Sequence, residues 1–101
     1  MRKMEITSKQ RAQLRGFAAN EPTIMQIGKD GITENLVRTV DDALEARELI
    51  KLGVLETCSL TPREAVAELA EACNAVPVCS IGRKIVLYRE SEDHKRIMLC
   101  R

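Results

Sequence analysis

The chain has 101 residues, of which 45% are hydrophobic and 31% are charged, and its formal net charge is +1. This composition excludes the low hydrophobicity and high net charge of disordered chains, and the length suits one buried core. No apolar run approaches the roughly 20 residues that cross a bilayer, and the opening MRKMEITSK lacks the apolar stretch of a signal peptide. We expect one cytoplasmic domain over residues 1–101, with no membrane partner.

Aromatic content and charge distribution narrow the possible partners. Phe17 and Tyr88 are the only aromatic residues, which excludes platforms of stacked rings such as that of an RRM. Residues 1–40 contain seven basic and four acidic residues, and residues 76–101 contain six basic and three acidic residues. Residues 41–75 between them contain three basic and eight acidic residues. If the fold brings the two ends of the chain together, a basic face will lie opposite an acidic one and suit an anionic partner.

Residues that could support metal binding or catalysis are sparse. Cys58, Cys73, Cys79 and Cys100 contain no C-x-x-C pair, so we expect reduced thiols and no metal. His94 is the only histidine, and we find no nucleophile elbow and no pair of acids at a suggestive spacing. We therefore expect no enzyme activity, no cofactor and no small-molecule substrate.

The first half of the chain has the pattern helix, strand, loop, helix. Thr7 and Gln10 have the spacing of a capping box before a helix over residues 8–20. A short strand over residues 23–27 precedes Gly28-Lys29-Asp30-Gly31, and Thr33 caps a second helix that closes near residue 48. Glycines let a ligand approach the backbone and a helix N-terminus favours phosphate, so the loop is a candidate phosphate site. Such a loop is also an ordinary strand–helix turn.

The second half of the chain adds a helix and three strands. An apolar run over residues 49–55 is typical of a central strand. Thr61, Pro62 and Glu64 form a strong start signal for a third helix, which Asn74 ends. Strands are predicted over residues 76–81 and 85–89, with Gly82 in the turn between them. Residues 90–101 are predicted to form a mobile tail or a short turn.

The element order α-β-α-β-α-β-β predicts an α/β two-layer fold with a four-stranded mixed sheet. The core is expected over residues 7–89. Basic residues outside the glycine loop form a candidate phosphate-binding set if the fold aligns them, although each alone is a common surface charge. They are Arg11, Arg15, Lys51, Arg83, Lys84 and Arg89.

Four segments resemble, in order and spacing, the motifs of the YhbY-like family, the bacterial stand-alone form of the chloroplast RNA splicing and ribosome maturation (CRM) domain. The resemblance covers about residues 7–89. The segments are QRAQLR at 10–15, QIGKDGIT at 26–33, ALEARELIK at 43–51 and IGRKIVLYR at 81–89.

The resemblance implies a fold similar to the C-terminal domain of translation initiation factor 3. It implies binding of ribosomal RNA in precursors of the large subunit, with a role in ribosome assembly. It also implies a G-x-x-G loop similar to the backbone clamp of KH domains. In this sequence the implied RNA-contacting residues are Gly28, Lys29, Asp30 and Gly31, with Arg11, Arg15, Lys51 and Arg83.

An alternative function remains open from the sequence. The acidic third helix or the apolar tail Ile97-Met98-Leu99 could dock on a protein partner, with the basic residues serving solubility alone. A contiguous positive face around Lys29 would favour RNA, whereas scattered charge beside an exposed apolar patch would favour a protein.

Overall fold

The computed structural model of the chain describes residues 6–91 and residue 97, which form three helices and four strands in the predicted order. No helix among these residues is long and apolar enough to cross a membrane. The elements are α1 (Ser8–Ala18), β1 (Thr23–Ile27), α2 (Glu34–Arg47), β2 (Leu49–Val54), α3 (Pro62–Cys73), β3 (Val76–Ile81) and β4 (Lys84–Tyr88).

The local start and stop signals act as predicted. Thr7 and Thr61 each form a capping box, and Asn74 ends α3 in the left-handed region with φ 53°. Helix α1 ends at Ala18, two residues before its predicted end. The difference arises because the amides of Asn20 and Glu21 donate to carbonyls three residues earlier, which forms a tighter turn.

The sheet is four-stranded and mixed, as predicted, with the order β1-β2-β4-β3. β1 and β2 are parallel, whereas β4 is antiparallel to both β2 and β3. Ile27 pairs with Val54, and Lys84 pairs with both Gly53 and Ile81. Three features therefore meet at one end of the sheet, here called the loop end: the loop 28–31, the end of β2 and the β3–β4 turn.

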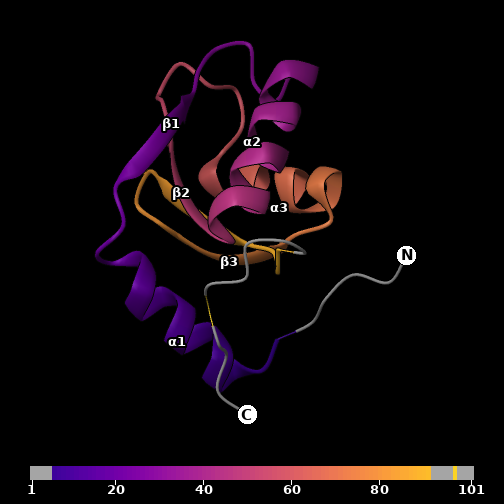
Figure 1. Cartoon of the computed structure of the whole chain (residues 1–101). Helices are drawn as coiled ribbons and strands as arrows, with labels where there is room; N and C mark the ends of the chain where they lie inside the picture. Colours follow the sequence, from indigo (N-terminus) through magenta and orange to yellow (C-terminus); the bar gives the residue numbers. More distant parts are fainter. Residues whose placement is uncertain (1–5, 92–96, 98–101) are drawn as a thin grey trace.

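Helices cover both faces of the sheet. The fold therefore has a helical layer on each side of the sheet, one layer more than the two-layer prediction. The larger core cluster contains Ile50, Leu52 and Leu87 and packs against α2 and α3. A second cluster, which includes Leu49 and Tyr88, packs against α1 on the opposite face. Figure 1 shows α1 apart from α2 and α3, beyond the strands. Because β2 and β4 carry apolar residues on both faces, a helix has to shield each face of the sheet from water.

Helix α1 covers only part of its face. Leu14 and Ala18 of α1 pack on the second cluster, which lies over the beginnings of β2 and β3. Nearer the loop end, the same face carries a row of residues across all four strands, here called the open row. The open row consists of Gln26, Gly53, Lys84 and Ile81. Gln26, Lys84 and Ile81 are exposed, and Ile81 is 66% exposed.

Two residues that follow β4, Ser91 and Ile97, are attached to the fold through Glu48. This residue ends α2 with φ 66°, and its carboxylate is fully buried. The carboxylate accepts hydrogen bonds of 2.8 Å from the amides of Ser91 and Ile97. Ile97 also packs against the α1-side cluster, so this residue of the predicted tail contacts the protein's own core. Met98 and Leu99 lie outside the described residues.

Candidate nucleic-acid interface

The loop Gly28–Gly31 is a tight turn that leads into α2. The amide of Gly31 donates a 3.0 Å hydrogen bond to the carbonyl of Gly28, and Gly31 has φ +66°. The Thr33 hydroxyl accepts from the amide of Leu36 and so caps α2. No atom outside the neighbouring residues lies within 4 Å of a Cβ placed at Gly31. The backbone of this corner is therefore open to an approaching ligand.

The tip of the loop carries two opposite charges, Lys29 and Asp30, and both side chains are exposed. Within the described residues, the amides of these two residues donate to no acceptor, so they can reach an anion. The Asp30 carboxylate likewise accepts no hydrogen bond from the described part of the chain. The carboxylate therefore does not cap the loop, and its negative charge weakens the attraction of Lys29 for an anion.

Arg83 lies at the loop end and holds it together. Its Nε donates to the carbonyl of Val54 at 2.6 Å, and its Nη2 donates to the carbonyl of Leu55 at 2.8 Å. Leu55 in turn donates its amide to Ile27, the residue before the loop. The Arg83 guanidinium thus contributes its charge near the loop while using part of its donors on the backbone.

Arg11 is placed elsewhere. Its Nη1 donates to the carbonyls of Pro77 and Val78 at 2.5 and 2.7 Å, at the irregularity in β3. These carbonyls lie toward the start of β3, whereas the loop 28–31 lies beyond the opposite end of the sheet. The structure therefore does not bring Arg11 to the glycine loop.

Three other cations meet around a cavity of about 140 Å³, here called the α1 pocket, between the end of α1 and the sheet. Arg15, Lys51 and Lys84 supply its charges, and Lys51 Nζ donates to the carbonyl of Ala18 at 3.4 Å. From Lys51, β2 runs three residues to Val54 at the loop end, a distance of about 10 Å. The open row lies between the pocket and the loop, because Lys84 and Ile81 of this row line the pocket and Gln26 precedes the loop by two residues.

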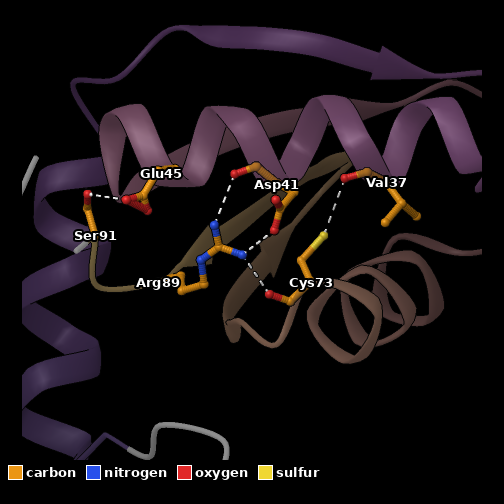
Figure 2. A network of polar contacts seen from close by, with 6 residues as sticks. All are labelled: Val37, Asp41, Glu45, Cys73, Arg89 and Ser91. Carbon is orange, nitrogen blue, oxygen red and sulfur yellow. Dashed lines mark hydrogen bonds and ion pairs between the residues drawn. The ribbon is translucent and has the colours of Figure 1, made fainter. Parts of the chain in front are cut away.

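Arg89 belongs to the opposite face. Its guanidinium contacts the Asp41 carboxylate at 2.5 Å and donates to the carbonyls of Asp41 and Cys73 at 3.0 and 2.9 Å. Figure 2 shows this guanidinium between α2 and the end of α3. Arg89 therefore joins α2 and α3 to β4 and is removed from the predicted phosphate-binding set.

The α1 pocket is the feature that sequence reasoning missed. Cys79, Ile81 and Val86 line it, and in the sequence they are ordinary strand residues. Alternation along β3 and β4 shows that such residues share a face, but no sequence pattern says where α1 stops covering that face. Among residues 6–91 and 97, no group of three His, Cys, Asp or Glu residues could hold a metal ion.

Comparison with known proteins yields relatives over nearly the whole chain. One is the probable RNA-binding protein YqeI of Bacillus subtilis (strain 168), 39% identical over 94 residues, which cover 93% of this chain and 98% of YqeI. A protein of Haemophilus influenzae named RNA-binding protein is 31% identical over 90 residues, which cover 89% of this chain and 91% of that protein.

A solved structure and a family model agree with these relatives. The solution structure of SAV1595 from Staphylococcus aureus matches with a TM-score of 0.74 and 44% identity, covering 95% of this chain and 100% of that one. The model of the CRS1 / YhbY (CRM) domain matches residues 6–89. The resemblance found in the motifs is thereby confirmed, and the chain belongs to the CRS1/YhbY (CRM) domain family.

Proposed function

We propose that the protein binds RNA without catalysing a reaction on it, and that its target is ribosomal RNA in precursors of the large subunit, where it assists assembly in the cytoplasm. Relatives named as RNA-binding proteins support the RNA part of this proposal. The ribosomal target and the role in assembly rest on the family resemblance.

One observation supports RNA binding most directly: the open row carries Lys84 and Ile81 of the α1 pocket at one end and, at the other, Gln26, two residues before the exposed turn 28–31. The turn offers the amides of residues 29 and 30 and the Lys29 ammonium to a phosphate, ahead of the capped start of α2. Arg15, Lys51 and Lys84 continue the positive surface along the sheet. Contacts of this kind recognise the sugar–phosphate backbone and the shape of an RNA more than its sequence.

The number of available cations sets the expected salt dependence. Arg11 and Arg83 each give two hydrogen bonds of 2.5–2.8 Å to backbone carbonyls, whereas Lys51 makes a single long one of 3.4 Å. We therefore count Lys29, Arg15, Lys51 and Lys84 as phosphate contacts. Four neutralised phosphates on single-stranded RNA give a slope of log K against log salt of about −3, a loss of about fiftyfold between 50 and 200 mM. Binding that is insensitive to salt would contradict phosphate recognition.

A loop variant tests where the RNA binds. A Cβ at Gly28 would meet only Leu55 Cδ1 at 3.7 Å, an ordinary contact, so the position has room for the first atom of a side chain and Gly28→Asp adds a negative charge there. We expect Gly28→Asp to reduce RNA affinity at least about tenfold with little change in melting temperature, and Gly28→Ala to retain most of the affinity. Equal affinity of the folded Asp variant and the wild type would remove the loop from the interface.

A matched charge reversal controls for net charge. Lys29→Glu and Arg47→Glu change the net charge equally, but Arg47 ends α2, about 20 Å from the loop along the helix. Only Lys29→Glu is expected to weaken binding.

Sequencing RNA crosslinked to the protein in its native extract then tests the target, and absence of large-subunit precursor RNA would reject that part of the proposal. A protein-interaction module would show no specific RNA binding in any of these assays.

A further inference from the structure

The α1 pocket has an apolar floor and a basic rim. Cys79, Ile81 and Val86 of β3 and β4 line it together with the alanines at the end of α1. Burial raises the pKa of the Cys79 thiol, more than the charges of Arg15, Arg11 and Lys51 lower it. The sulfur is therefore uncharged at neutral pH and belongs to the apolar floor.

The cations of the rim have no acidic partners. No lining residue is Asp or Glu, and within the described residues the side chains of Arg15 and Lys84 make no hydrogen bond or ion pair. Lys51 contacts only a backbone carbonyl, at 3.4 Å. A ligand that suits this pocket therefore combines a flat or compact body of low polarity with adjoining negative charge.

Size restricts the apolar body further. A cavity of roughly 150 Å³ accepts a benzene ring, so the 140 Å³ of the α1 pocket suits one six-membered ring. Among the parts of an RNA strand, a pyrimidine base matches this size, and its flanking phosphates match the cationic rim. A purine, with two fused rings, exceeds it.

We propose that the α1 pocket holds one unstacked pyrimidine base of a bound RNA strand, with the adjacent phosphates on Arg15, Lys51 and Lys84. This inference rests on the proposed RNA binding and adds a base-binding subsite to it. Aliphatic residues and a thiol replace the aromatic rings on which bases commonly stack. The pocket presents few polar groups to the edge of the base, so it accepts uracil and cytosine alike.

An NMR titration of the full chain separates the subsite from the rest of the interface. The probes are a hexauridylate and the same hexamer with abasic ribose throughout. We expect both to shift the amides of residues 28–31, and only the hexauridylate to shift the methyl groups of Ile81 and Val86. Shifts in the loop without base-dependent shifts in the pocket would overturn the subsite while leaving RNA binding intact. No shift at either place would overturn the proposed function itself.

Two substitutions at Cys79 give a matched test of the cavity. Cys79→Leu fills the pocket without changing charge, whereas Cys79→Ala removes the thiol and leaves the pocket open. We expect the Leu variant to bind hexauridylate about tenfold more weakly and the abasic hexamer unchanged, with the Ala variant near wild type for both. Equal loss for both hexamers in the Leu variant would assign its effect to general damage and reject the subsite. Chemical denaturation of each variant checks that the fold is retained.

Discussion

Arg11 donates a 2.7 Å hydrogen bond from Nη1 to the carbonyl oxygen of Val78, which attaches α1 to the edge strand β3. Arg15, four residues further along the same helix, instead lines the α1 pocket, and its side chain makes no hydrogen bond or ion pair with the described residues. Two arginines that lie one helical turn apart on α1 therefore have different roles. Arg11 stabilises the fold, and Arg15 lies on the candidate RNA surface.

Alanine substitutions separate these roles. Arg11→Ala leaves two backbone carbonyls without their donor and is expected to lower the free energy of unfolding by about 1–3 kcal/mol. Arg15→Ala is expected to change that free energy by less than about 0.5 kcal/mol and to weaken RNA binding about fivefold. Urea denaturation and fluorescence anisotropy with labelled RNA measure the two effects. A stability loss for Arg15→Ala as large as that for Arg11→Ala would contradict the assignment.

Removal of the acidic charge at the loop tip is expected to strengthen RNA binding. The Asp30 carboxylate is exposed and accepts no hydrogen bond within the described residues, so Asp30→Asn removes repulsion without removing a contact. Two unit charges about 4 Å apart in water interact by about 1 kcal/mol, which corresponds to about fivefold in affinity at low salt. Affinity measured at 50 and 200 mM salt tests this, and the gain should shrink at the higher concentration. Weaker binding by the Asn variant would show that Asp30 orders the loop.

The two glycines of the loop are expected to differ in their tolerance of a side chain. Gly31 has φ +66°, so Gly31→Ala introduces backbone strain and should lower the free energy of unfolding by about 1–2 kcal/mol. Gly28 does not have a positive φ, and Gly28→Ala should cost less than about 0.5 kcal/mol. Thermal or urea denaturation of the two variants provides the comparison. Equal losses would mean that the turn relaxes when Gly31 is replaced.

The network around Arg89 is expected to support stability and not RNA binding. Arg89→Gln removes the hydrogen bonds to Asp41 and to the Cys73 carbonyl. We expect it to lower the free energy of unfolding by about 1–3 kcal/mol. Arg89→Lys should restore less than half of this, because a single ammonium cannot replace the planar fork of guanidinium donors that Figure 2 shows. RNA affinity of the folded variants should stay within about twofold of the wild type. A large loss of RNA affinity would show that Arg89 takes part in RNA binding.

Stability should fall at high pH because of Tyr88. Burial, together with the negative charges of Glu48 and Glu90, raises the pKa of the Tyr88 hydroxyl to about 12 from 10. Between these values the unfolded chain has released a proton that the folded chain retains, so the free energy of unfolding falls as pH rises from about 10 to 12. The loss should reach about 3 kcal/mol at most. Tyr88→Phe should show a smaller decline over that range in urea denaturation, and an identical decline would contradict this origin.

Local signals made much of the fold predictable. Thr7 with Gln10 and Thr61 with Glu64 placed the starts of α1 and α3, because a capping box satisfies helix amides through residues three positions apart. Asn74 ended α3 for a similarly local reason. The glycine loop was identifiable because its position between a strand and a capped helix is a property of adjacent residues.

Spacing along the chain was enough to predict the positions of the helices and strands, the mixed sheet and the set of basic residues that could bind phosphate. The packing of the elements in three dimensions was needed to place α1 on the face opposite α2 and α3, where it stops short of the open row. It also decided that Arg11 and Arg89 bind within the protein whereas Arg15 and Lys51 meet Lys84 around a pocket. The reason is that a guanidinium pairs with whatever acceptors the packing brings near it, and those of Arg11 lie at Pro77 and Val78, 66 and 67 residues away.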